Sequence, residues 1–270
     1  MTEEQKSLQW LSTILDILRK ECPWDSVQTV DSLRYLTIEE VFELSDTIAA
    51  KDYEGMCKEL GDLFMHLMFY SKIADDERRF STVDVIDGIC KKLISRHPHI
   101  GLPDREGTIH PATAKEAPQW EKVKMKEGRR SVMEGVPKGI PTVVKAQRLQ
   151  EKAAGIGFEF NDAEGAHEKA KEEYKELLGA LSIMQKTKND GDKANAEGEL
   201  GDLLFAIINW ARMEGLNADN ALAKTNLKFV ERFTIMEQIA EEQGIALSDL
   251  TKAEMVDLWK KTKEYPFSKE

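Results

Sequence analysis

The pentapeptide Glu-Leu-Gly-Asp-Leu occurs twice in this 270-residue chain, beginning at Glu59 and again, 140 positions later, at Glu199. An apolar run of matching length follows each occurrence. Three further pairs of segments match in the same order: 37–44 with 170–177, 92–97 with 228–233, and 120–124 with 259–263. Four matches in one order indicate a duplicated unit, so whatever fold the first copy adopts must also suit the second.

Apolar residues in both copies recur at helical spacing. Leu8, Leu11, Leu15 and Leu18 fall on one helix face, and alternating β patterns and Asn-Gly turns are missing. The same period marks the ranges near 28–50, 53–76, 82–96, 142–154, 163–187, 194–215, 217–242 and 251–264. The chain is therefore predicted to be all-α. Because the helices of one copy are too apolar to face solvent as a pair, we expect four-helix-bundle cores that form on dimerisation, most simply in a homodimer.

The repeat also predicts a domain organisation. Residues 1–100 form an N-terminal module and residues 142–270 a C-terminal module. Residues 101–141 hold five of the eight prolines and are expected to be a connector with a short helix near Trp120. Copy two has seven more residues between its two acidic motifs, and the polar stretch 186–192 is expected to form a correspondingly longer loop.

Composition narrows the classes of function. The chain has 49 acidic and 38 basic residues, for a net charge of −11, which argues against binding a nucleic-acid polymer. The three cysteines form no Cys-x-x-Cys pair, which favours a reduced, cytoplasmic setting. The N-terminus has no secretory pattern, and no apolar run approaches the roughly 20 residues that span a membrane.

Each copy contains two pairs of carboxylates, and the members of each pair are three residues apart. They are Glu40 with Glu43 and Glu59 with Asp62 in copy one, and Glu173 with Glu176 and Glu199 with Asp202 in copy two. Each pair lies on one side of its helix, and a turn between the helices brings the acidic faces together. Asp62 and Asp202 directly precede apolar runs and are expected near the core. Carboxylates gathered there need a cation, and oxygen ligands suit Mg²⁺ or Mn²⁺.

Other interpretations of these residues are less favourable. Acidic pairs often line solvated helix faces, but Gly61 and Gly201 inside the acidic segments favour close approach of another group. A di-iron bundle requires Glu-x-x-His, and His66 has Ala206 at its position in copy two, which favours a core histidine. The His-Pro-His stretch at 97–99 lacks further ligands and is interpreted as a helix stop with surface histidines.

Glu-Glu-x-x-Glu followed by Glu-x-x-Asp, after 15 residues in copy one and 22 in copy two, resembles the signature of the all-α nucleoside triphosphate pyrophosphohydrolases. The stretches 22–29, 92–99 and 155–160 extend the resemblance, which is closest to the MazG family and covers nearly the whole chain. It implies hydrolysis of nucleoside triphosphates to the monophosphate and pyrophosphate, with broad base specificity and a requirement for Mg²⁺ that Mn²⁺ can meet.

The resemblance also implies roles for particular residues. The metal ligands would be Glu173, Glu176, Glu199 and Asp202, with Glu172 as a further catalytic carboxylate, and a second copy of the site at Glu40, Glu43, Glu59 and Asp62. The substrate-binding residues would be Lys169, Lys228, Arg232, Trp259 and Lys263, together with Trp24, Lys92, Arg96, Trp120 and Lys124. Copy two is favoured as the catalytic one. A solvated face for Lys228 and Arg232, and a core-capping role for Trp259, remain alternatives. A nucleotide-binding regulator that does not cleave remains the alternative function, ahead of a ligand-free helical scaffold.

Overall fold

The computed structural model describes residues 1–116, 123, 125 and 128–264. Apart from one isolated bridge between Pro103 and Ile109, the regular secondary structure of these residues is helical, which confirms the all-α prediction. Trp120 and Lys124, and most of the short helix expected around them, lie outside the described residues. The chain divides into two compact units, Met1–Ala114 and Lys115–Phe267.

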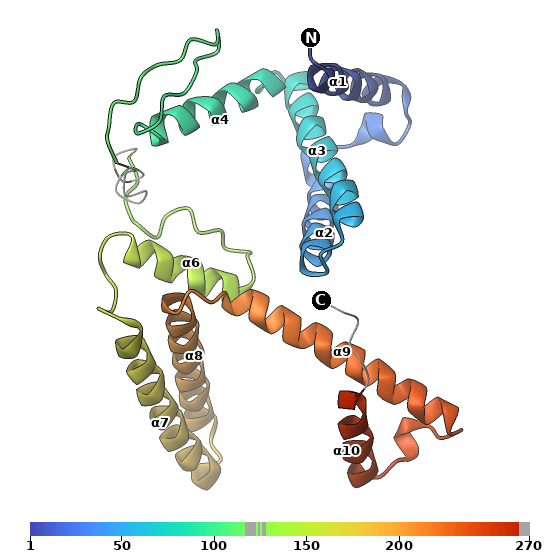
Figure 1. Cartoon of the computed structure of the whole chain (residues 1–270), viewed down its shortest axis with the longest axis vertical. Helices are drawn as coiled ribbons and strands as arrows, with labels where there is room; N and C mark the ends of the chain where they lie inside the picture. The colour runs from blue at the N-terminus through green and yellow to red at the C-terminus, as the bar shows by residue number, and fades with distance from the viewer. Residues whose placement is uncertain (117–122, 124, 126–127, 265–270) are drawn as a thin grey trace. The chain divides into compact units, whose positions relative to one another are not determined.

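The first unit is organised around an antiparallel helical hairpin. Its helices are α1 (Glu3–Glu21), η1 (Asp25–Val27), α2 (Val30–Ala49), α3 (Tyr53–Asp76) and α4 (Thr82–Arg96) (Figure 1). Residues 50–52 join α2 to α3, and α1 packs against α3. The buried core of this unit comes from α1, α2 and α3: Leu15, Leu33, Met68, Phe69 and Ile73.

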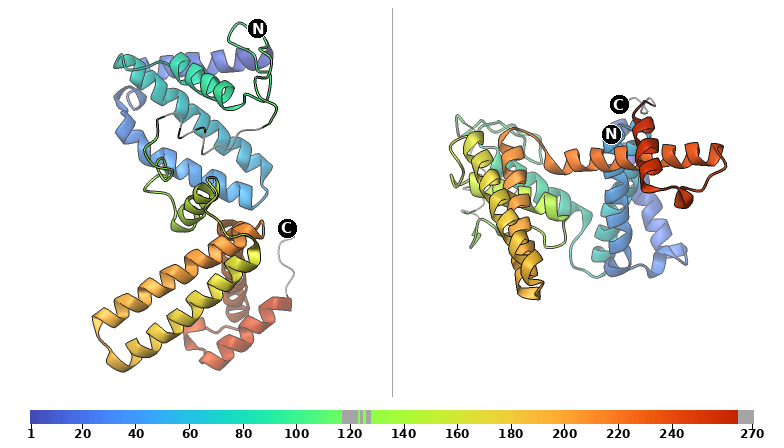
Figure 2. Two further views of the ribbon diagram at one scale, coloured as in Figure 1. Left: turned by 90° about the vertical axis from the view of Figure 1, so that its left-hand side faces the viewer. Right: turned by 90° about the horizontal axis from the view of Figure 1, so that it is seen from below.

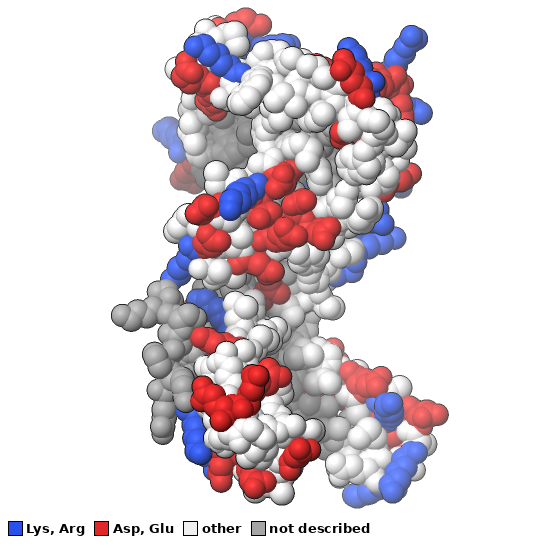
Figure 3. Space-filling model, turned by 90° about the vertical axis from the view of Figure 1, so that its right-hand side faces the viewer, with Lys and Arg blue, Asp and Glu red and all other residues white. Residues whose placement is uncertain are grey.

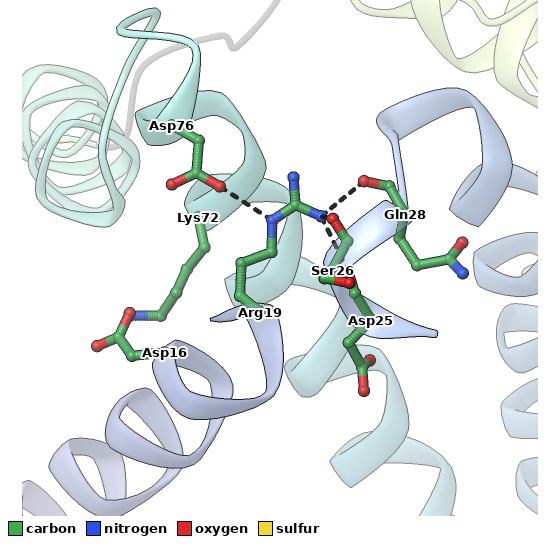
Figure 4. Close-up of polar contacts among 7 residues, drawn as sticks. All are labelled: Asp16, Arg19, Asp25, Ser26, Gln28, Lys72 and Asp76. Carbon is green, nitrogen blue, oxygen red and sulfur yellow. Dashed lines mark hydrogen bonds and ion pairs between the residues drawn. The ribbon is translucent and has the colours of Figure 1, made fainter. Parts of the chain in front are cut away.

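One arginine fixes the turn between α1 and α2 (Figure 4). The guanidinium of Arg19 donates hydrogen bonds to the main-chain oxygens of Asp25, Ser26 and Gln28, at 3.0, 3.1 and 2.8 Å. Its Nε pairs with Asp76 at the end of α3, at 2.9 Å. The three main-chain oxygens share the two N–H groups of Nη1, while Nε serves Asp76, so one planar guanidinium reaches all four acceptors. The turn that contains Trp24 is thereby attached to the α3 end of the hairpin.

The second unit repeats the hairpin and adds a C-terminal arm. Its helices are α6 (Thr142–Ala154), α7 (Ala163–Thr187), α8 (Asp190–Met213), α9 (Ala218–Glu242), η2 (Leu247–Asp249), α10 (Lys252–Lys261) and η3 (Thr262–Glu264). Helices α7 and α8 pack antiparallel to each other (Figure 2). Helix α9 leads away from this hairpin and α10 folds back onto α9, as the views in Figures 1 and 2 agree. The arm has a small core of its own: Met236, Ile239, Ala240 and Leu258.

The hairpin of copy two is longer than that of copy one because its helices are longer. Helix α2 ends six residues after Glu43, whereas α7 ends eleven after Glu176. Helix α3 begins six residues before Glu59, whereas α8 begins nine before Glu199. The prediction that the extra residues form a longer loop at 186–192 is therefore wrong.

Capping explains this difference. Asn189 precedes α8, and its side chain accepts a hydrogen bond from the main-chain N–H of Asp192 at 2.8 Å. Lys188, with φ of 53°, adopts the left-handed conformation that ends α7. A polar stretch that resembles a loop in the sequence thus supplies a helix end and the next helix start within two residues.

Both hairpins carry apolar side chains that are exposed in the part of the chain that the structure describes. Among them are Phe42, Phe64 and Leu67 on α2 and α3, and Tyr174, Leu178 and Leu204 on α7 and α8. The chain has more acidic than basic residues, and on the face shown in Figure 3 Asp and Glu gather in groups with few basic side chains among them. Within the described residues, no helix combines the length and the hydropathy needed to cross a membrane.

Candidate metal and nucleotide site

In copy one, the hairpin brings together carboxylates from both of its helices. Glu40 on α2 and Glu59 and Asp62 on α3 each offer an oxygen, and these oxygens all lie within 4.8 Å of one another. Burial, followed by repulsion from Asp62 and Glu43, raises the pKa of Glu40 above its ordinary 4.5. Burial and then Glu59 raise the pKa of Glu43 as well. Full ionisation of these carboxylates is therefore unfavourable without a compensating positive charge.

Copy two also has three carboxylates close together, but they are not all at the positions that correspond to those of copy one. Glu173 and Glu176 on α7 and Glu199 on α8 offer oxygens within 4.8 Å of one another. Glu173 is buried, with 7% of its surface exposed. Burial, and then repulsion from Glu173 and Glu199, raises the pKa of Glu176 above 4.5. The fourth predicted acid, Asp202, follows Glu199 by three residues on α8 and lines the adjoining pocket.

A lysine distinguishes the two clusters. Lys169 Nζ lies 2.7 Å from a carboxylate oxygen of Glu173 and 2.9 Å from one of Glu172. These hydrogen bonds raise the pKa of Lys169, so it stays charged at neutral pH. At the offset of the repeat, copy one has Leu36 instead, and this leucine packs against the core of the first unit. Copy two therefore carries a positive charge that copy one lacks at the same place.

One expectation about the clusters is wrong. Asp62 and Asp202 are exposed rather than close to the core. The apolar runs that follow them are themselves only partly covered, since Phe64 and Leu204 are exposed in this single chain. The buried acid of the set is Glu173, on the other helix of the hairpin.

A pocket of about 730 Å³ adjoins the acidic cluster of copy two. Lys169, Glu173 and Asp202 line it together with residues of α6, α8 and the segment between α6 and α7. The rest of its lining is mainly apolar: Met133, Leu149, Ala153, Gly157, Phe158, Phe160, Phe205 and Ala206, with the polar side chains Gln150, Glu159, Asn209 and Arg212. Its volume lies within the range of roughly 300–1,000 Å³ that is usual for small-molecule sites.

The remaining basic and aromatic candidates of copy two lie together on the C-terminal arm. The guanidinium of Arg232 on α9 lies 5.8 Å from the ring centre of Trp259 on α10, and Phe229 packs against the same indole at 5.2 Å. Lys228 on α9 and Lys263 in η3 are exposed. Neither α9 nor α10 contributes to the described lining of the pocket. The arm and the acidic cluster are thus separate parts of one chain.

In copy one, Lys92 is exposed on α4 and Arg96 is half-buried. Trp24 is 56% exposed in the turn that Arg19 holds. His66 is a buried core histidine, as predicted: its Nδ1 lies 3.2 Å from Thr37 Oγ1, and burial lowers its pKa.

The His-Pro-His stretch behaves as predicted in one respect and not in another. Helix α4 ends at Arg96, and His97 is its C-terminal cap. Both His97 and His99 are half-buried, however, so the expectation of surface histidines is wrong.

Comparison with known proteins finds a family model and several relatives that match this chain. Residues 28–101, the acidic hairpin and α4 of the first unit, match the MazG nucleotide pyrophosphohydrolase domain. The nucleoside triphosphate pyrophosphohydrolase/pyrophosphatase MazG of Thermotoga maritima is 36% identical over 258 residues, covering 94% of each chain. The nucleoside triphosphate pyrophosphohydrolase of Escherichia coli is 33% identical over 260 residues, covering 94% of this chain and 95% of its own. A protein of the same name from Mycobacterium tuberculosis is 35% identical over 148 residues.

An all-helical chain with two acidic hairpins and relatives of this similarity defines a class, the all-α nucleotide pyrophosphohydrolases. Within that class the chain belongs to the MazG family.

The polar residues of the pocket are not among those predicted from the sequence. Gln150, Asn209 and Arg212 have no counterpart in the acidic motifs, and their spacing matches no known ligand pattern. One signal was available: Gln150 interrupts the apolar side of α6, where Leu149 and Ala153 flank it. A glutamine that a helix buries needs partners for its amide, which points to a polar environment at that place.

Proposed function

We propose that the chain hydrolyses nucleoside triphosphates to the nucleoside monophosphate and pyrophosphate in a Mg²⁺-dependent reaction, for which Mn²⁺ substitutes. The observation that carries the proposal is the pair of carboxylate clusters, each gathered from both helices of its hairpin. Membership of the MazG family supports the reaction class. Broad base specificity is part of the proposal, as is a cytoplasmic setting, which the free cysteines favour.

The donor set of copy two suits a hard divalent cation. Glu173, Glu176 and Glu199 offer oxygens only. The pKa of Glu176 is raised by burial and then by repulsion from Glu173 and Glu199, and a cation would relieve that repulsion. We propose that these three acids hold Mg²⁺, with Asp202 as a further ligand on the pocket side. A bound Mg²⁺ would supply charge neutralisation for the triphosphate and acidify a bound water.

The other side chains of copy two would orient the reactants. We propose that Lys169, which now bridges Glu172 and Glu173, transfers its hydrogen bonds to a phosphate oxygen when the triphosphate arrives. Glu172 is exposed, and without Lys169 its carboxylate would be free to accept a proton from the attacking water. Lys228, Arg232, Trp259 and Lys263 form the second proposed group of substrate contacts.

We propose copy two as the catalytic copy. Lys169 supports this choice, because Leu36 gives copy one no cation at that position. Copy one, with Glu40, Glu43, Glu59 and Asp62, would then bind metal but would lack the lysine contact to phosphate. The modules 1–100 and 142–270, with the connector 101–141, remain the proposed division of these roles.

A homodimer is also part of the proposal. The exposed apolar faces of the hairpins would be buried by a second copy of the chain. The space beside Gly61 and Gly201 is open, since an added Cβ at either would meet no other atom of the described chain within 4 Å, so a second copy could approach there. Because α9 leads away from its own hairpin, the arm of one chain could bring Lys228 to the acidic cluster of the other. Light scattering at micromolar concentration tests the dimer, and a monomer would contradict it.

Complementation tests whether two chains share a site. Glu199→Gln and Lys228→Met proteins, each impaired alone, are mixed after dissociation and reassociation. If sites form between chains, about a quarter of the wild-type activity returns, since half of the dimers are mixed and each mixed dimer has one intact site. If all of the needed residues come from one chain, mixing restores nothing.

Pyrophosphate release from a panel of the four common nucleoside triphosphates, with Mg²⁺, Mn²⁺ or chelator, tests the reaction itself. The proposal predicts equimolar monophosphate and pyrophosphate with either metal and no product with chelator. Tight nucleotide binding without any product would favour the non-catalytic regulator instead.

A further inference from the structure

The pocket beside the acidic cluster of copy two contains a buried polar atom that has no hydrogen-bond partner among the described residues. Gln150 on α6 is buried, with 6% of its surface exposed, and its Nε2 donates a hydrogen bond to the main-chain oxygen of Phe205 at 2.8 Å. A carbonyl oxygen can only accept, so the amide nitrogen of Gln150 is committed to Phe205. Its Oε1 is buried without a hydrogen-bond partner in the described chain. A buried acceptor without a hydrogen bond costs free energy, so a ligand that donates a hydrogen bond to it would bind favourably.

Three other polar side chains of the pocket, those of Arg212, Glu159 and Asn209, are engaged with one another. Arg212 pairs with Glu159 at 2.5 Å and donates to Asn209 Oδ1 at 2.9 Å. These contacts close a network at the wall of the pocket that leaves no net charge on the Arg212–Glu159 pair. Among the described pocket-lining residues, Gln150 Oε1 is thus the buried side-chain atom that lacks a partner. The pocket calls for a largely apolar ligand that presents a hydrogen-bond donor.

An exposed aromatic ring lies at the same pocket. Phe158 lines it, yet 80% of the residue is exposed, and it follows Gly157, whose φ of 92° sets the turn after α6. Trp24 occupies the corresponding turn after α1 and is also exposed. A large aromatic ring that is exposed to solvent in both copies can stack on a flat ligand, because stacking buries the two ring faces that meet.

We propose that this pocket binds the nucleoside half of the triphosphate, with the base against Phe158 and Gln150 Oε1 accepting a hydrogen bond from an N–H on the base edge. The proposal rests on the proposed function, because Glu173 and Asp202 line the same pocket and would bring the triphosphate to it. Gln150 then requires a hydrogen-bond donor on the base edge without selecting one base over another. The amino groups of adenine and cytosine and the ring N–H groups of guanine and uracil can all meet a single acceptor, so the pocket accepts every common base.

Analogues without that donor test the idea. Purine riboside triphosphate lacks the amino group of ATP and presents no N–H on the equivalent edge. The wild-type protein should hydrolyse ATP with a kcat/KM roughly tenfold to a hundredfold above that of purine riboside triphosphate. Gln150→Met, of similar volume, should remove this preference by slowing ATP alone. Gln147→Met is the matched control, since Gln147 lies on the same helix, bonds to Glu151 and does not line the pocket.

Calorimetric binding of AMP and of purine riboside monophosphate provides a second readout that does not depend on turnover. Wild-type protein should bind AMP at least tenfold more tightly, and Gln150→Met should bind the two alike. Phe158→Ala, a change at an exposed position, should weaken both ligands equally.

The outcomes separate the two proposals. A wild-type protein with no preference for AMP, or a Gln150→Met protein that keeps it, overturns the pocket assignment even if pyrophosphate release is normal. A protein that prefers AMP through Gln150 but releases no pyrophosphate from ATP supports the pocket and contradicts the proposed reaction.

Discussion

Replacing Arg19 by methionine should destabilise the first unit by an amount that its contacts allow us to estimate. The change removes three hydrogen bonds to main-chain oxygens and one to Asp76. A hydrogen bond from a charged group contributes about 1.5–3 kcal/mol net, but Asp76 is mostly exposed and the freed carbonyls regain some water. We therefore expect a loss of about 3–4 kcal/mol in the free energy of unfolding, less than the sum of the four contacts.

Urea unfolding followed by circular dichroism measures this loss. With a slope near 2 kcal/mol per molar urea, the midpoint of the first unit should fall by about 1.5–2 M. Arg19→Lys keeps the charge but has one nitrogen, so we expect about half of the loss. Lys20→Met, at the exposed neighbouring position, should change the midpoint by less than about 0.3 M. An Arg19→Met protein as stable as the Lys20 variant would refute the claim that Arg19 holds the turn.

Two further predictions concern the acidic cluster of copy two. Lys169→Met should tighten the binding of Mg²⁺ in the absence of nucleotide, because a competing cation is removed. The same change should lower kcat/KM for ATP by about tenfold or more. Lys171→Met loses only the pairing with Glu168 and should have neither effect. Because the pKa of Glu176 is raised above 4.5, its ionisation opposes folding, and the metal-free protein should lose stability relative to Glu176→Gln as pH rises from 4.5 through the raised pKa. Thermal melts measure this difference in stability between the wild-type and Glu176→Gln proteins, and adding Mg²⁺ should reduce it. A metal-free wild-type protein that gains stability relative to Glu176→Gln as pH rises would contradict the assignment.

The helices were predictable because their signals are local. The apolar period fixes the ranges of α3, α4, α6 and α7 as the structure has them. The start of α8 was missed by four residues because Asn189 acts as a cap, and a capping asparagine in the sequence resembles a loop residue as closely as a helix start. The convergence of Glu40 with Glu59, and of Glu173 with Glu199, follows from spacing and antiparallel pairing alone.

The features that tertiary packing decides were not predictable. Which acid is buried depends on tertiary packing, and nothing in the sequence distinguishes Glu173 from the neighbouring Glu172. The pocket exists because α6 packs on α8 and Gln150 reaches the main chain of Phe205, a contact between residues 55 positions apart. Residue spacing along one helix carries no information about such a contact.

We propose above all that the acidic cluster on α7 and α8 performs the hydrolysis. Pyrophosphate release from ATP with Mg²⁺, measured side by side for Glu199→Gln and Glu59→Gln, tests it most directly, because the two substitutions are chemically identical and fall at matching positions of the repeat. Each keeps the size of the side chain and removes a charge that Mg²⁺ requires. We expect a loss of at least about 100-fold in kcat for Glu199→Gln and near-normal turnover for Glu59→Gln. Equal partial losses in the two variants, or a larger loss for Glu59→Gln, would contradict it.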